Sequence, residues 1–308
     1  MYKCLIWGSG RVFHNNILAI KYFECIGEIC VEGVTSNDLF YKDVAGYRFI
    51  LKSDLKSENG IYGFDKVIVM ADGNAYVDIC MEIADLGFAD KDIVPYKVMN
   101  LVGFDFIKYA ALREHVPSII APNCWGGITY NTLGLPFNSP IINMFFEPDD
   151  YLKMLKNLDY YMEQDLSFVR TQYNKDIDIN YPVASCGDIL LFFNHYRSFE
   201  EAAAKWEERK KRINWDNIFV MFFDEQGNNT EAFSEIPYEK RVYFTERQYK
   251  EDKPKWLVTF PHESRRNSSD GFYNVVNRSG KGDIIHYDLF ELLLNGKIVL
   301  HSTFSNGE

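Results

Sequence analysis

Lys-Cys-Leu-Ile-Trp-Gly-Ser-Gly, at residues 3–10, is the stretch that decides the fold of the first part of the chain. A short apolar run ends in a glycine turn, and apolar side chains then recur at helical spacing as far as Ile20. This order of strand, tight turn and helix predicts a Rossmann-like βαβ unit, whose turn amides and helix dipole attract phosphate. Phe13 replaces the third glycine of the G-x-G-x-x-G pattern, which weakens the expectation of a complete dinucleotide.

Other apolar runs in this part also end in polar turns, at residues 36–38 and 72–74. Because ligands of open parallel sheets bind beyond the carboxyl ends of the strands, we expect these turns and the glycine turn to share one ligand-binding edge. The candidate binding residues are Gly8, Ser9, Gly10, Arg11, Asp38 and Asp72. Asp38 is placed to hold ribose hydroxyls, although it comes later than the usual acidic residue, and a polar turn is an equally good interpretation.

The length of 308 residues suits two domains, and the 47% of hydrophobic residues excludes wholesale disorder. We expect a Rossmann-like nucleotide- or sugar-binding domain at residues 1–100, a helical connector at 101–117 and a second α/β domain at 118–308. The formal charge of −11 disfavours nucleic acid as a partner. No apolar run is long enough for a membrane span, no signal peptide is evident, and the cysteines are scattered, so the predicted location is cytoplasmic.

Strands and helices also alternate in the second part. Apolar runs predict strands at residues 118–121, 139–146, 189–194, 217–223, 241–245 and 255–260. Helices are predicted from Pro148 to about Gln164, after the capping box of Ser198 and Glu201, and at 286–294. The fold class expected for the whole chain is α/β, a Rossmann-like parallel-sheet domain followed by a second α/β domain.

Cys124 is the strongest candidate nucleophile. It follows a predicted strand at a helix start, where a thiol pKa is lowered and amides can hold an oxyanion. His195 and His262 are candidate bases, and Asp188 or Glu263 is placed to orient one of them. A buried cysteine beside a tight turn is the more common interpretation of the same pattern.

Asp224 and Glu225 end a predicted buried strand. Acidic pairs in this position hold Mg²⁺ or Mn²⁺ beside the diphosphate in many nucleotide-sugar transferases. The residues that follow, 226–229, are typical of an ordinary turn, and a structural role is the stronger of the two interpretations.

Both parts resemble known families. The glycine turn, the Ser/Asn/Asp turn after the second strand and the Gly46-Tyr47 strand resemble Rossmann-like modules of bacterial sugar-modifying acyltransferases, which implies a nucleotide-linked sugar as ligand rather than NAD. The second part is similar to an uncharacterised bacterial family described as exopolysaccharide biosynthesis proteins, for which no catalytic residues are established. That resemblance is carried by residues 123–127, 134–140, 188–189, 195–196, 198–202 and 205–214.

The leading hypothesis is a protein of surface-polysaccharide synthesis that binds a nucleotide-sugar or phosphorylated sugar, with transfer as one reaction open to it. A non-catalytic scaffold of a polysaccharide assembly complex is the first alternative, because no complete catalytic motif occurs. An NAD-dependent sugar oxidoreductase or epimerase is the second, and the missing third glycine argues against it. The sequence leaves open the cofactor, a divalent metal being less expected, and whether the chain forms a homo-oligomer.

Overall fold

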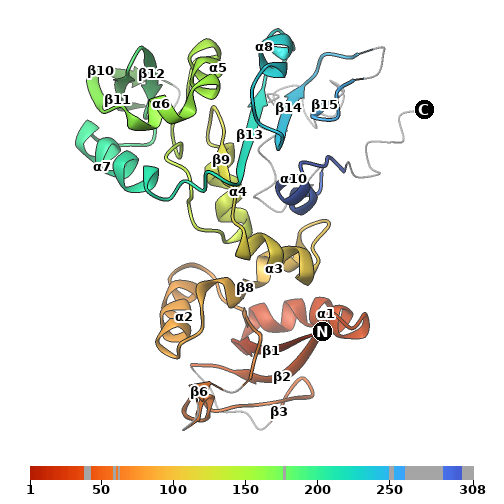
Figure 1. Cartoon of the computed structure of the whole chain (residues 1–308). Coiled ribbons are helices and arrows are strands. Elements are labelled where there is room, and N and C mark those ends of the chain that lie inside the picture. Colours follow the sequence, from red (N-terminus) through yellow and green to blue (C-terminus); the bar gives the residue numbers. More distant parts are fainter. Residues whose placement is uncertain are drawn as a thin grey trace. The chain divides into compact units, whose positions relative to one another are not determined.

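The computed structural model describes residues 1–37, 43–57, 60–61, 63–175, 178–249, 253–260 and 287–299. The chain divides into two compact units, unit 1 at Met1–Glu114 and unit 2 at His115–Glu308 (Figure 1). The helix expected between the domains is α3, Phe106–Glu114, and it belongs to unit 1. No described helix combines the length and the apolar character that crossing a bilayer requires.

Unit 1 is built around a parallel sheet with the strand order β2-β1-β7-β8. Its strands are β1 (Tyr2–Trp7), β2 (Ile29–Thr35), β7 (Lys66–Val69) and β8 (Ile93–Pro95). Helix α1 (Arg11–Cys25) connects β1 to β2, and α2 (Gly73–Asp85) connects β7 to β8. The predicted Rossmann-like arrangement of strand, glycine turn and helix is confirmed.

Helices α1 and α2 cover opposite faces of the sheet of unit 1 (Figure 1). The chain passes from the central strand β1 to β2 at one edge of the sheet, and from the central strand β7 to β8 at the other edge. Because crossovers between parallel strands are right-handed, two crossovers that lead to opposite edges of the sheet place their helices on opposite faces, and the direction in which strands are added reverses between β1 and β7. We call this point, at the carboxyl ends of β1 and β7, the switch point.

Short segments extend the β2 side of unit 1. They are β3 (Asp43–Val44), β4 (Tyr47–Arg48), the 3-10 turn η1 (Lys52–Leu55), β5 (Lys56–Ser57) and β6 (Gly60–Ile61). Phe49, which follows β4, forms a parallel bridge with Val34 of β2. The segment after β4 therefore runs beside the edge of the sheet.

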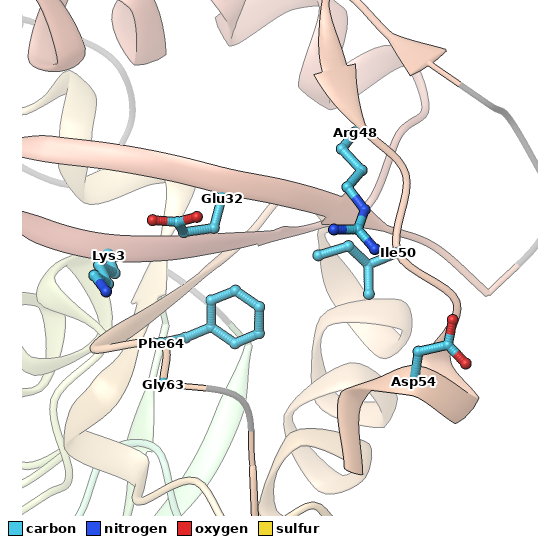
Figure 2. A pocket seen from close by; sticks show the side chains of 7 residues that line it. All are labelled: Lys3, Glu32, Arg48, Ile50, Asp54, Gly63 and Phe64. Carbon is cyan, nitrogen blue, oxygen red and sulfur yellow. The ribbon is translucent and has the colours of Figure 1, made fainter. Parts of the chain in front are cut away.

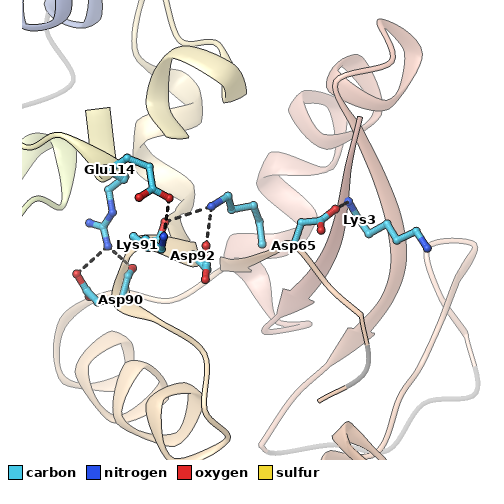
Figure 3. A network of polar contacts seen from close by, with 8 residues as sticks. Lys3, Asp65, Asp90, Lys91, Asp92 and Glu114 are labelled. Atoms are coloured by element: carbon cyan, nitrogen blue, oxygen red, sulfur yellow. Dashed lines mark hydrogen bonds and ion pairs between the residues drawn. The ribbon is translucent and has the colours of Figure 1, made fainter. Parts of the chain in front are cut away.

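Ion pairs attach α3 to the rest of unit 1 (Figure 3). Arg113, which is 6% exposed, donates to the Asp90 carboxylate at 2.8 Å, and Lys91 pairs with Glu114 at 2.6 Å. Asp90 and Lys91 lie in the 3-10 turn η2 (Asp90–Asp92), directly before β8. A third 3-10 turn, η3 (Tyr96–Asn100), follows β8.

Unit 2 contains a second parallel sheet, with the order β15-β14-β13-β9. Its strands are β9 (Ser118–Ile120), β13 (Ile218–Phe223), β14 (Arg241–Thr245) and β15 (Leu257–Thr259). An antiparallel sheet contains β10 (Leu166–Asn174), β11 (Ile179–Cys186) and β12 (Ile189–Phe192). The described helices of unit 2 are α4 (Trp125–Leu133), α5 (Pro148–Lys156), α6 (Leu158–Glu163), α7 (Phe199–Lys210), α8 (Thr230–Ser234) and α10 (Leu289–Asn295). The expected α/β class is confirmed.

Three local predictions for unit 2 were wrong or incomplete. Residues 139–146 form no strand apart from a bridge at Phe145, because Pro140 has no amide hydrogen and Asn143 adopts a φ of +59°. The predicted helix after Pro148 is divided at Asn157. Strand β10 was missed because most of its side chains are exposed, so that it carries no pattern of buried residues.

Gly8 should be far less tolerant of substitution than Gly10. Gly8 has a φ of +113°, and a Cβ there would lie 2.9 Å from the Met70 carbonyl oxygen, whereas a Cβ at Gly10 meets nothing within 4 Å. We expect Gly8→Ala to lower the free energy of unfolding by about 1–3 kcal/mol. The matched variant Gly10→Ala should change it by less than about 0.5 kcal/mol. Urea denaturation of the full chain measures both, and equal stability of the two variants would contradict the role of Gly8.

Candidate functional site

The loop between β1 and α1 lies at the switch point, between the ends of the neighbouring strands. The Gly8 amide donates to the Thr35 carbonyl at the end of β2 at 2.8 Å, and the Met70 amide after β7 donates to the Trp7 carbonyl at 2.8 Å. The positive φ of Gly8 permits this double contact, and the chain then enters α1 through Ser9 and Gly10. The glycine turn is thus held by both adjacent strands.

The start of α1 is open to a ligand. Gly10 is the N-cap residue, and open space surrounds the position of its missing Cβ. The Phe13 ring is fully buried and packs edge-to-face against Tyr47, with ring centroids 6.4 Å apart. The ring at the third glycine position therefore fills the interior beneath α1 and leaves the loop at Gly10 clear.

The first backbone amides of α1 and α2, the two helices at this edge, have no acceptor from an N-cap side chain. In both α1 and α2 the N-cap side chain makes no capping hydrogen bond, and the first turn contains no acidic residue. The first amides of a helix need acceptors and carry the positive end of its dipole. These two helix starts are consequently suited to anionic oxygens.

Asp72 and its partners form one part of the rim. Its carboxylate pairs with Lys97 at 2.6 Å and accepts a hydrogen bond from the Tyr96 hydroxyl at 2.7 Å. The hydrogen bond from Lys97 is the main cause that lowers the pKa of Asp72, because it favours the charged carboxylate. Lys97 in turn offsets the negative charge that Asp72 would present to an anion.

Asn37 forms another part of the rim, after β2. It accepts a hydrogen bond from the Trp7 indole at 3.0 Å and donates to Glu82 of α2 at 2.6 Å. Arg11 is exposed at the start of α1, and the predicted Asp38 lies outside the described residues. The sequence placed Asn37 in the 36–38 turn of this edge without singling it out, whereas Tyr96 and Lys97 were missed. Asp72 was selected because ligands of parallel sheets bind beyond the carboxyl ends of the strands. The same reasoning applies to Tyr96 and Lys97, which follow β8.

Cys124 occupies the N-cap position of α4 and is half-buried. The preceding Asn123 is 6% exposed. Its Oδ1 accepts from the Trp125 amide at 2.8 Å, and its Nδ2 has no partner among the residues that the structure describes. The glycines that follow have a packing reason, since a Cβ at Gly126 would lie 3.3 Å from Ile119 of β9. The thiol of Cys124 thus lies at a helix start, as the nucleophile hypothesis expects. The contact of Gly126 with β9 gives a structural reason for a glycine after it.

The structure describes two of the proposed partners of Cys124, His195 and Asp188. His195 is exposed, and Asp188 lies in the turn between β11 and β12, where it pairs with Lys153 and accepts from the Tyr161 hydroxyl at 2.8 Å. Among the described residues, no hydrogen bond joins Asp188 to His195. His262 and Glu263 lie outside those residues.

Asp224 directs its carboxylate toward its own turn. It accepts from the amides of Gln226 and Asn229, each at 3.0 Å, from the Asn229 side chain at 3.0 Å and from the Tyr243 hydroxyl at 3.0 Å. Burial acts to raise the pKa of Asp224, but these donors stabilise the charged form, and the net pKa is lowered.

The described residues contain no cluster of three or more His, Cys, Asp or Glu side chains suited to a metal ion. Glu225 is exposed beside Asp224. The hydrogen bonds of Asp224 therefore provide a structural reason for an acidic residue at this strand end.

Comparison with known proteins divides the chain between residues 94 and 96, whereas the fold divides it after Glu114. Residues 96–292 match the family model of a domain of unknown function, DUF1919, and residues 1–94 match the model described as C2185-like, N-terminal. An uncharacterized protein of Haemophilus influenzae is 35% identical over 177 residues, which span 56% of this chain and 81% of that relative.

The structural role of Asp224 predicts a pH-dependent loss of stability on substitution. We expect Asp224→Ala to lower the free energy of unfolding by about 1–3 kcal/mol at neutral pH, because part-buried donors lose their acceptor. Since the folded-state pKa is lowered, this stabilisation is complete above the ordinary aspartate pKa and disappears as the pH falls through the folded value. Thermal unfolding of both proteins at neutral and acidic pH tests this. A large Mg²⁺-dependent stabilisation of the wild type, lost in Asp224→Ala, would instead indicate a metal site.

The nucleophile hypothesis predicts that Cys124 alkylates faster than Cys25. Cys25 is exposed but lies at the C-terminal, negative end of α1, whereas Cys124 is half-buried at a helix start. Burial raises the pKa of Cys186 to about 11, so that thiol serves as an unreactive reference. Iodoacetamide labelling near neutral pH, followed by mass spectrometry, gives the order, and slower labelling of Cys124 than of Cys25 would exclude an activated thiol.

Proposed function

The chain belongs to the DUF1919 family, and we propose that it binds a nucleotide-sugar or related phosphorylated sugar at the switch point of unit 1, for the synthesis of a surface polysaccharide. One observation carries the binding proposal. An accessible glycine turn and two helix starts without caps lie at the same edge of a parallel sheet. Phosphate oxygens are the natural acceptors for such amides.

The rim chemistry fits the remainder of such a ligand. Arg11 and Lys97 are cations near the anion-binding amides, while Asn37 and Tyr96 bring amide and hydroxyl groups suited to ribose or sugar hydroxyls. A nucleotide-sugar combines a diphosphate with a polyol, so it uses both kinds of group.

A single nucleotide suits unit 1 better than a dinucleotide. A dinucleotide-binding Rossmann fold consists of two mononucleotide-binding halves, whereas the parallel sheet of unit 1 has the four strands β2-β1-β7-β8. Phe13 at the third glycine position also favours a single nucleotide over a dinucleotide. The role in polysaccharide synthesis, and transfer as its reaction, rest on the sequence resemblances of the two parts. All six cysteines are free, which supports a cytoplasmic location as part of the proposal.

Gly10→Asp should abolish ligand binding without unfolding the protein. The backbone at Gly10 is extended and its Cβ position is open, so aspartate can cap the first amides of α1 and fill the phosphate position with negative charge. Calorimetric titration with UDP- and GDP-sugars should give measurable heat for the wild type. For Gly10→Asp we expect at least about a tenfold loss of affinity with an unchanged or higher Tm.

Gly10→Asn is the matched control, since it also caps the helix but adds no charge. Its affinity should lie between those of the wild type and Gly10→Asp. If a broad panel of nucleotide-sugars gives neither heat nor a thermal shift with the wild type, the binding proposal fails.

A further inference from the structure

Unit 1 contains a pocket away from the switch point. A pocket of about 310 Å³ is walled by Lys3, Glu32, Arg48, Ile50, Asp54 and Phe64 (Figure 2). Lys3 precedes Gly8 by five residues on the same strand, so about 16 Å separates this pocket from the glycine turn. Its volume is at the small end of the range for ligand pockets, which indicates a ligand of about one ring.

An irregularity in β2 shapes this pocket. Cys4 pairs with Val31 and Leu5 pairs with Gly33, so Glu32 is an extra residue in the parallel ladder. Bulges are rare between parallel strands, and they redirect a side chain at functional sites. The bulge thus sets the position from which Glu32 enters the pocket wall.

Gly33 brings the opposite wall close to the strand. A Cβ at Gly33 would lie 2.4 Å from Cδ1 of Ile50 and 3.0 Å from the Arg48 carbonyl oxygen, so glycine allows the segment after β4 to run this close to β2. This close approach places Arg48 and Ile50 beside the pocket. The wall therefore depends on a bulge and a glycine at adjacent positions of one strand.

Each end of the pocket presents one cation and one carboxylate. Figure 2 shows Lys3 and Glu32 at one end and Arg48 and Asp54 at the other, with Phe64 and Ile50 between them. Within the described part of the chain, no ion pair engages the Lys3 ammonium or the Arg48 guanidinium. Donors and acceptors are thus available at both ends of an apolar floor.

We propose that this pocket binds the ring of a monosaccharide. A sugar hydroxyl both donates and accepts, so it can hydrogen-bond to a carboxylate and a cation at the same time. The C–H face of a pyranose packs on an aromatic ring such as that of Phe64. Phosphate fits less well, because Glu32 and Asp54 would repel it. The site does not depend on the nucleotide-sugar proposal and could take a free sugar or the end of a glycan chain.

Saturation-transfer NMR on the full chain tests this assignment. The ligands are glucose, galactose and N-acetylglucosamine, each as the free sugar and as its methyl glycoside, which mimics a residue at the end of a glycan. We expect saturation of the ring protons on one face, and stronger binding of the methyl glycoside if the source is a glycan. Arg48→Gln, an exposed position, and Phe64→Leu should each weaken binding about tenfold.

Two controls separate this site from the rest of the chain. Arg197→Gln removes an exposed cation in unit 2 and should leave the sugar signals unchanged. Gly10→Asp should also leave them unchanged, because it alters only the switch point. Absence of saturation transfer for every sugar, or binding that survives both Arg48→Gln and Phe64→Leu, would overturn the proposal.

Discussion

The close approach of Gly8 to the Met70 carbonyl is the constraint on which unit 1 depends. It occurs where β1 and β7 end side by side, and it requires both a positive φ and the absence of a Cβ. The same turn sets the start of α1. The reversed direction of strand addition after β7 places the start of α2 on the opposite face of the sheet. The geometry that joins the strands thereby gathers unsatisfied helix amides at one edge, where they remain available to a ligand.

The partners of each acidic group distinguish a structural role from a binding role. Asp224 is surrounded by donors of its own turn, and Asp188 is engaged by Lys153 and Tyr161, so both stabilise local geometry. Asp72 stands between these cases, since Lys97 and Tyr96 hold it at the rim of an open edge. Glu32 differs from all three, because a bulge exposes it in a concave wall without an ion pair to a described residue. Position at a strand end selects candidates, and the hydrogen-bond partners then separate them.

The position of α3 shows that a family boundary and a structural boundary need not coincide. The DUF1919 match begins at residue 96 and so includes α3, yet Arg113 and Glu114 of this helix pair with Asp90 and Lys91 of the first unit. A fragment that begins at the family boundary would remove α3 from these partners and leave the buried Arg113 without its carboxylate. Because Arg113 itself is buried, the loss of its partner leaves a buried charge unpaired, so a cut after Glu114 is the better experimental boundary.

The sequence by itself determined the features that depend on neighbouring residues. These include the strand and glycine turn at residues 3–10, the α/β class, and the capping box in which the Glu201 amide donates to Ser198 at 3.2 Å. The tertiary structure alone decided the bulge at Glu32, the close approach of Ile50 to Gly33 and the partners of Asp188 and Asp224. Periodicity and turn chemistry are local, whereas register, close approach and ion pairing join residues distant in the chain and are fixed only when the elements pack.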